Sequence, residues 1–170
     1  LVDSAHSAGL KVIHTEQLAV HWDLTPEEHE ALETVWDDTE WTSALFAEWI
    51  EYVVPRAKMA ERHGVEMFLP YLFSDVGTFS AEGYVEEWRA IISEIREVYS
   101  GEIAMNVINA DERLLPLVDD LDAVLITVFP GLYTSALEDQ YNPTVEEIAE
   151  ITTGFFNAPR EFIGGKVPVY

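Results

Sequence analysis

The sequence predicts an α/β fold in which strands and helices alternate around a parallel sheet. Short apolar runs of strand length alternate with longer segments whose apolar residues recur every three or four positions. Such alternation is typical of right-handed strand–helix–strand units. With 48% hydrophobic residues among 170, the chain has enough apolar mass for a packed core. We therefore expect one domain over residues 1–170.

The chain is expected to begin with a short helix over residues 1–8, closed by Gly9 just after its end. A strand is expected next, over residues 10–15. The run Thr25-Pro26-Glu27-Glu28 predicts the start of a second helix. Threonine suits the capping position, proline the first helical position, and glutamate three residues after the cap completes a capping box.

A long helix is expected over residues 41–63, because its aromatic and aliphatic residues follow helical spacing. Pro55 is expected to kink this helix or to split it in two, since proline lacks the N–H group that a helix interior needs. Gly64 is expected to end it. Residues 65–72 are almost entirely apolar, which is typical of a buried parallel strand.

The clearest helical pattern of the sequence follows Ser80, which is expected to cap a third long helix. Gly101 is expected to end that helix, and a strand is expected over residues 102–108. The apolar stripe of this helix is expected to face the core; it comprises Tyr84, Val85, Trp88, Ile91, Ile92, Ile95, Val98 and Tyr99.

The last third of the chain continues the alternation. A weak helix containing Pro116 is expected over residues 111–121, and a strand over 123–129. A second capping box predicts a helix over 144–156. A fifth strand is expected over 166–170.

Two parallel-sheet architectures fit this order of elements. An open doubly wound sheet that binds a nucleotide would need a glycine-rich loop after a strand, whereas Gly164-Gly165 precedes one. The segments after the strands are long, polar and aromatic, as expected of the loops that form the active site of a (β/α) barrel. A complete barrel takes about 250 residues, so we expect an incomplete TIM-barrel-like domain.

Composition excludes several classes of function. The net charge of −23, from 32 acidic and 9 basic residues, argues against nucleic acid and anionic membranes as partners. The absence of cysteine excludes disulfides and thiolate chemistry. The motifs of serine hydrolases, P-loop enzymes and helical zinc proteases are missing. A neutral polysaccharide fits this charge better than a polyanion, and no cofactor is expected.

The order of motifs resembles the middle of a retaining (β/α)8-barrel glycoside hydrolase, and is most similar to the family 113 endo-β-mannanases. The resemblance covers about residues 10–170. It rests on the runs Glu40-Trp41 to Ile50, Ala60-Glu61-Arg62-His63-Gly64-Val65-Glu66-Met67-Phe68, Trp88-Arg89 to Ser100-Gly101, and Leu121-Asp122-Ala123-Val124 with Phe129-Pro130-Gly131-Leu132-Tyr133.

This resemblance implies that the chain spans barrel strands 3 to 7. Such a piece leaves open edges at its first and last strands. We therefore expect missing barrel segments or further copies of the chain as partners.

The resemblance also implies an acid/base Glu at the end of strand 4 and a nucleophilic Glu at the end of strand 7. The position that matches the acid/base falls on or near Phe73, and Asp75 is the nearest carboxyl group. The chain ends at Tyr170, before a nucleophile is expected. The usual pair of glutamates, which retaining enzymes hold about 5–5.5 Å apart, is therefore expected to be lacking in this chain.

Two carboxylates remain candidates for catalysis, Asp75 and Glu16. The alternative role for Asp75 is a cap of the turn Asp75-Val76-Gly77, and the sequence favours this role over the catalytic one. Period-2 alternation places Glu16 on the same strand face as His14, a candidate for substrate binding. His14 and Glu16 with His21 and Asp23 also have the residue types of a metal site, but their spacing is loose and we predict no metal.

The remaining candidates for substrate binding are amide and aromatic side chains at or after strand ends. Amides can bind sugar hydroxyls or the loop backbone, and aromatic rings can stack on sugars or pack loops over the barrel. These candidates are Asn106, Asn109, Trp22, Tyr71, Phe129 and Tyr133.

The predicted function is hydrolysis or binding of a neutral β-linked polysaccharide, with mannan as the leading substrate. The alternative is a barrel without catalytic activity that binds carbohydrate or serves as a scaffold. An extracellular or secreted location is expected for either.

Overall fold

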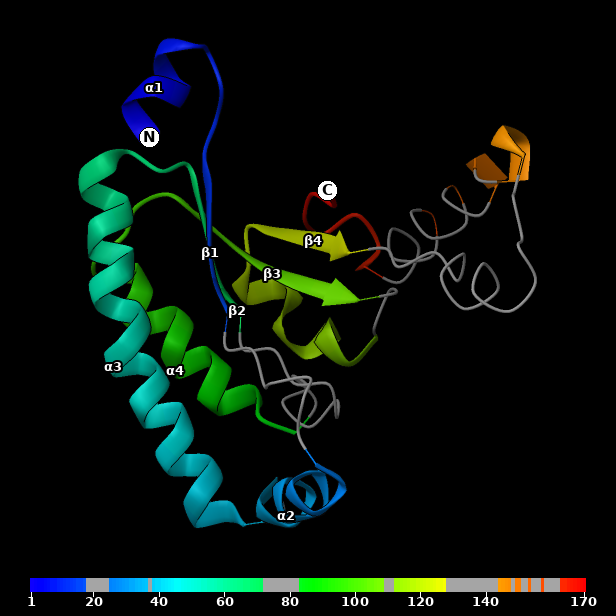
Figure 1. Cartoon of the computed structure of the whole chain (residues 1–170). Coiled ribbons are helices and arrows are strands. Elements are labelled where there is room, and N and C mark those ends of the chain that lie inside the picture. Colours follow the sequence, from blue (N-terminus) through cyan, green and yellow to red (C-terminus); the bar gives the residue numbers. More distant parts are fainter. Residues whose placement is uncertain are drawn as a thin grey trace.

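The computed structural model describes residues 1–17, 25–36, 38–71, 83–108, 112–127, 144–147, 149–150, 153, 157 and 163–170. Figure 1 shows the elements of these segments. In chain order they are α1 (Val2–Ser7), β1 (Ile13–Gln17), α2 (Pro26–Trp36), α3 (Thr39–His63), β2 (Met67–Tyr71), α4 (Val85–Arg96), β3 (Glu102–Ile108), the 3₁₀ helix η1 (Glu112–Asp120) and β4 (Ala123–Thr127).

The four strands form one parallel sheet in the order β1-β2-β3-β4. The carboxy-terminal segment adds a parallel bridge between Val169 and Val124 of β4. The Val124 N–H donates to the Pro168 carbonyl at 2.9 Å, and the Tyr170 N–H donates to the Val124 carbonyl at 3.0 Å. The predicted α/β fold with a parallel sheet is confirmed, and a backbone pairing occurs where the fifth strand is expected.

Pro55 was expected either to kink this helix or to split it in two. Helix α3 runs as one helix through Pro55, so the split was wrong, and the kink stays a prediction. At its start, the Asp38 carboxylate accepts hydrogen bonds from the N–H groups of Glu40 and Trp41 at 2.9 and 3.1 Å. At its end, Gly64 adopts the left-handed conformation, with φ of 67°. These two caps satisfy backbone groups that the helix itself leaves unpaired.

Helix α4 buries the apolar stripe predicted for it. Trp88, Ile91 and Ile95 are fully buried, and Tyr99 follows just beyond the helix end. The helix begins at Val85 with Tyr84 at the capping position. The predicted cap at Ser80, which lies outside the described residues, was therefore wrong. The stripe joins residues of α3, η1 and the strands in the main hydrophobic core, so α3 and α4 lie side by side along one face of the sheet (Figure 1).

Both predicted capping boxes form. The Thr25 N–H donates to Glu28 Oε2 at 2.7 Å, and the Glu28 N–H donates back to the threonine hydroxyl at 3.3 Å. Thr144 and Glu147 repeat the arrangement at 2.8 and 3.2 Å. The helix expected around Pro116 is instead the 3₁₀ helix η1.

The sheet has two faces with different neighbours. The outer face carries Phe68, Ile103, Met105 and Val124, which pack against the helices in the main core. The inner face carries a separate buried cluster of Met67, Leu69, Ala104 and Ala123. Side chains alternate between the two faces along a strand. The two sets therefore show on which face of the sheet each other residue of β1 to β4 lies.

Strand β1 lies at the edge of the sheet and, within the described segments, pairs only with β2. Ile13, its first residue, is half exposed. The partner segments or further copies expected at the sheet edges stay a prediction.

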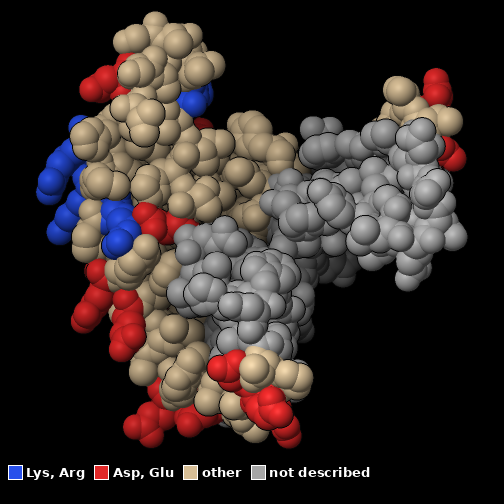
Figure 2. All heavy atoms as spheres, in the orientation of Figure 1, with Lys and Arg blue, Asp and Glu red and all other residues tan. Residues whose placement is uncertain are grey.

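Charge is distributed unevenly over the surface. Figure 2 shows Asp and Glu gathered over α2 and the amino-terminal half of α3, and Lys and Arg over the carboxy-terminal half of α3. Among the described helices, none combines the length and the apolar character needed to cross a membrane.

Candidate functional site

The carboxyl ends of the four parallel strands lie at the same edge of the sheet, where ligands of such sheets bind. β1 ends at Gln17 and β2 at Tyr71, and these two residues are direct partners in the register. β2 pairs with β3 through Met67 and Glu102. Continuing that register along both strands places Asn106 level with Tyr71, so the ends of the first three strands form one continuous edge.

Asn106 lies on the inner face at this edge. It alternates with Met105, which packs against the helices, and it is the register partner of Leu125, which packs against the inner cluster. Its side chain is partly buried. An amide group carries one acceptor oxygen and two donor hydrogens, the kinds of group that pair with the hydroxyl groups of a sugar.

Thr15 also belongs to the inner face and was missed in the sequence analysis. It is the register partner of Leu69, a member of the inner cluster, and its side chain is exposed. Thr15 lies between His14 and Glu16 in the sequence, so period-2 alternation places it on the opposite face of the strand from these two residues. That pattern could have marked Thr15 as a candidate. Thr15 and Asn106 thus bring a hydroxyl and an amide to the same face of the sheet from two different strands.

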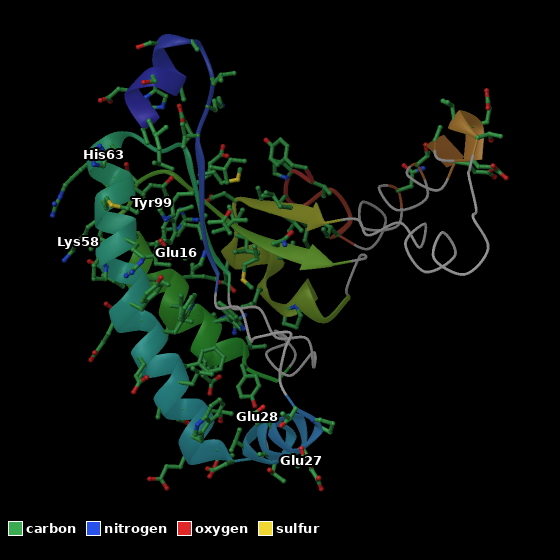
Figure 3. All side chains as sticks on the ribbon, in the orientation of Figure 1. Glu16, Glu27, Glu28, Lys58, His63 and Tyr99 are labelled. Carbon is green, nitrogen blue, oxygen red and sulfur yellow. The ribbon has the colours of Figure 1, made fainter. Side chains whose placement is uncertain are left out.

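Glu16 and His14 share a strand face as predicted, but that face is the outer one. The His14 ring stacks on Phe68 of the core, with ring centroids 5.3 Å apart. His14 Nε2 lies 2.6 Å from Glu16 Oε1, and Arg56 Nε of α3 lies 3.2 Å from Glu16 Oε2. Figure 3 shows Glu16 between β1 and α3.

The structure therefore separates two sets of predicted site residues. Glu16 and His14 face α3, whereas Asn106 faces the inner side of the sheet. Both oxygens of the Glu16 carboxylate already have partners within the protein. The catalytic role of Glu16 and the substrate-binding role of His14 stay predictions.

The other predicted site residues cannot be placed beside these. Asp75, Trp22, Asn109, Phe129 and Tyr133 lie outside the described residues, and Tyr71 is described only by its backbone at the end of β2. Their assignments stay predictions.

No three His, Asp or Glu side chains of the described segments come together as ligands for a metal ion. His21 and Asp23, which the sequence offered as further ligands, lie outside these segments.

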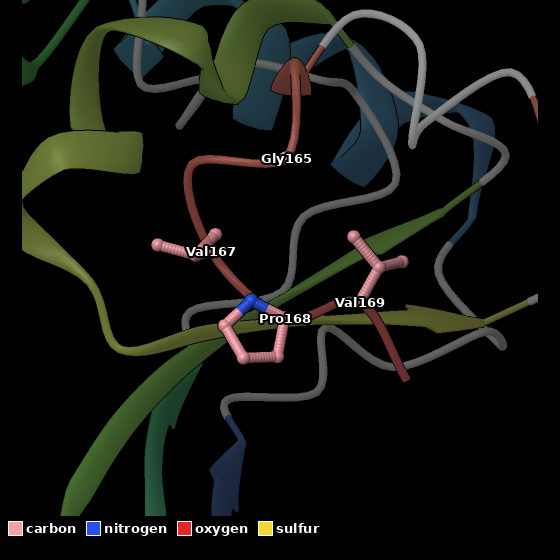
Figure 4. A pocket seen from close by; sticks show the side chains of 4 residues that line it. All are labelled: Gly165, Val167, Pro168 and Val169. Carbon is pink, nitrogen blue, oxygen red and sulfur yellow. The ribbon is translucent and has the colours of Figure 1, made fainter.

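A pocket lies beside the carboxy-terminal segment. Among the described residues it is lined by Gly165, Val167, Pro168 and Val169 (Figure 4). Its described lining carries no ionisable side chain, so it offers apolar and backbone contacts rather than acid–base chemistry.

The sequence model of Glycoside Hydrolase Family 113 matches residues 1–164. No curated protein matches the chain.

Solved structures with a similar fold include a GH113 β-1,4-mannanase, with a TM-score of 0.52, and a complex structure of a GH113 β-1,4-mannanase, with 0.54. Each is 20% identical over 99% of the chain, which spans 65% of the length of these neighbours. A third is the GH113 β-mannanase AaManA from Alicyclobacillus acidocaldarius in complex with ManMIm. It is 20% identical, with a TM-score of 0.56, over 91% of this chain and 46% of its own.

Proposed function

The chain belongs to glycoside hydrolase family 113, and from this membership we propose that it acts on or binds a neutral β-linked polysaccharide, with β-1,4-mannan as the first candidate. The family match over residues 1–164 is the observation that carries the proposal. The structural neighbours are named as β-mannanases, which supports mannan ahead of other neutral polysaccharides.

The carboxyl edge of the sheet supports a carbohydrate ligand on chemical grounds. Asn106 and Thr15 present uncharged hydrogen-bonding groups on the inner face, the kind of group that pairs with sugar hydroxyls. The net charge of −23 would repel an anionic polymer but carries no penalty for a neutral one. We place this function outside the cell, where a polymeric polysaccharide is accessible.

Binding without hydrolysis is the second candidate, and two observations favour it. The position at which family resemblance expects the acid/base Glu falls on or near Phe73, and a phenyl ring cannot transfer a proton. Among the described carboxylates at the strand ends, Glu16 is directed toward Arg56 and away from the inner face. Hydrolysis would then need Asp75 in the acid/base role, together with a second carboxylate as the nucleophile.

Calorimetry and a reducing-end assay on the full chain separate these candidates. We expect mannohexaose to bind, and polygalacturonate, an anionic polymer, not to bind. Release of reducing ends from mannan that is lost in Asp75→Asn would establish hydrolysis. Binding without release would establish the second candidate. If neither mannohexaose nor cellohexaose binds to a folded sample, the proposed function is wrong.

A further inference from the structure

An edge strand lacks the hydrogen bonds that hold both sides of a central strand. β1 pairs only with β2 within the described segments, yet its carboxyl end forms part of the edge at which we propose that the polysaccharide binds. The residues of a ligand site must be held within fractions of an ångström of their binding positions, which requires supporting contacts around them. The contacts of Glu16 supply such support.

Glu16 is joined to α3 by an ion pair in which the carboxylate is nearly buried and the Arg56 side chain is 35% exposed. The Glu16 side chain is 13% exposed, and Oε2 lies 3.2 Å from Nε of Arg56, 40 positions later in the chain. Oε1 lies 2.6 Å from Nε2 of His14. His14 in turn stacks on Phe68 in the core. The carboxylate therefore connects the outer side of β1 to α3 and, through His14, to β2.

Arg56 is itself fixed by neighbours on α3. Its Nη1 donates to the Tyr52 carbonyl at 2.8 Å, and its guanidinium carbon lies 3.3 Å from the centroid of the Tyr52 ring. Tyr52 stacks on Trp49, whose indole N–H donates to the Pro70 carbonyl at 3.5 Å. Pro70 of β2 is the register partner of Glu16 in β1. These contacts therefore lead from β1 to α3, from α3 to β2, and from β2 back to β1.

We propose that Glu16, His14 and Arg56 form a clamp that positions the carboxyl end of β1 for ligand binding, and that Glu16 is a positioning residue. Side chains alternate along a strand, so fixing Glu16 on the outer face fixes Thr15 on the inner face beside Leu69. The proposal rests on the proposed function, since it assigns the clamp to the same ligand-binding edge. It also gives Glu16 a role other than the catalytic one predicted from the sequence.

The test compares Glu16→Gln and Arg56→Gln with Arg56→Lys, which keeps the positive charge near Glu16. Glu48→Gln is the matched control, because Glu48 is an exposed carboxylate on the same helix. Three quantities are measured on the full chain. They are the Kd of mannohexaose by calorimetry, the rate of mannan cleavage, and hydrogen exchange of the backbone amides of residues 13–17.

We expect Glu16→Gln and Arg56→Gln to raise the Kd about five- to tenfold and to speed exchange at residues 13–17. The double variant should bind no more weakly than the weaker single one, because both changes break the same pair. Arg56→Lys should recover part of the affinity. Glu48→Gln should match the wild type in all three measurements.

Three results would overturn the clamp. The first is a Kd within twofold of the wild type in both variants, which would leave Glu16 and Arg56 with a purely structural role. The second is unchanged exchange at residues 13–17. The third is loss of cleavage in Glu16→Gln with unchanged affinity and exchange, which would make Glu16 catalytic. If the wild type binds no mannohexaose, the proposed function fails, and with it the role of the clamp in ligand binding. Faster exchange in both variants would still show that the pair of Glu16 and Arg56 holds β1 in place, and unchanged exchange would overturn the clamp itself.

Discussion

The phenol of Tyr99 donates a hydrogen bond of 2.9 Å to the backbone carbonyl of Val65, which precedes it by 34 positions. Tyr99 follows α4 and Val65 precedes β2, so this bond joins the helix layer to the amino edge of the sheet. The Tyr99 side chain is 2% exposed. Figure 3 shows it at the upper end of α4, close to α3 and β2.

Replacing this tyrosine by phenylalanine should destabilise the fold. Tyr99→Phe leaves the Val65 carbonyl without its partner, which we expect to cost about 1–2 kcal/mol of unfolding free energy. Urea unfolding followed by tryptophan fluorescence measures the loss. Tyr170→Phe is the control, since Tyr170 is exposed, and equal stability of the two variants would contradict the prediction.

The burial of Tyr99 also leads us to expect that the folded protein loses stability in alkali. Burial, together with the charges of Glu61, Glu66 and Glu102, raises the pKa of Tyr99 from 10.0 to about 12. A group whose pKa is raised on folding stabilises the protein below its unfolded pKa and loses that contribution as pH rises through the folded value. The wild type should therefore lose more stability between about pH 10 and 12 than Tyr99→Phe does, as measured by unfolding at each pH.

Gly101 is required by the nearness of Tyr99. A Cβ atom at this position would lie 2.3 Å from the Tyr99 hydroxyl oxygen and 2.5 Å from Cζ. Gly101→Ala should destabilise the protein by about 1–3 kcal/mol through overpacking. The cost should be smaller in a Tyr99→Leu background, measured by the same denaturant series; additive effects would show that the clash is not with Tyr99.

The contacts of Glu66 lead us to expect that the folded protein loses stability in acid. The Val12 N–H, which donates to it at 2.8 Å, and His6, 3.2 Å away, hold the pKa of Glu66 below its ordinary value. A carboxyl group whose pKa is lowered on folding stabilises the protein above its unfolded pKa, and this contribution is lost as pH falls through the folded value. Stability should therefore fall below about pH 4.5 more steeply in the wild type than in Glu66→Gln. Thermal unfolding from pH 6 to 3 measures this, and Glu94→Gln, at an exposed position on α4, should behave as the wild type.

The cap of α3 offers a local test of helix stability. Asp38→Ala removes the acceptor of two backbone N–H groups and should cost about 1 kcal/mol. Asp38→Asn should cost less, because asparagine caps nearly as well. Thermal unfolding of both variants checks the order, and a reversed order would contradict the capping role.

Asn106 tests the inner face directly. Asn106→Ala should weaken mannohexaose binding about fivefold, the effect of losing one or two uncharged hydrogen bonds. Calorimetry measures the Kd, with unfolding by urea to show that the variant is folded. Ser93→Ala, at an exposed position on α4, is the control. An unchanged Kd in Asn106→Ala would remove Asn106 from the ligand site.

Much of the fold could be predicted from the sequence because its signals are local. The stripe of α4, the two capping boxes and the strand over 102–108 each depend on residues within a few positions of one another. The family prediction also came from the order of local motifs, and the match over residues 1–164 confirms it.

The candidate site was less predictable, because it depends on contacts between distant segments. Period-2 alternation showed that His14 and Glu16 share a face, but which face meets α3 depends on packing between β1 and a helix that lies beyond α2. Arg56, the partner of Glu16, is 40 positions away, and no local pattern links the two. The sequence by itself determined the elements, their order and the family. Only the tertiary structure decided that Glu16 faces a helix and Thr15 the inner face, because side-chain facing is set by long-range burial rather than by neighbours along the chain.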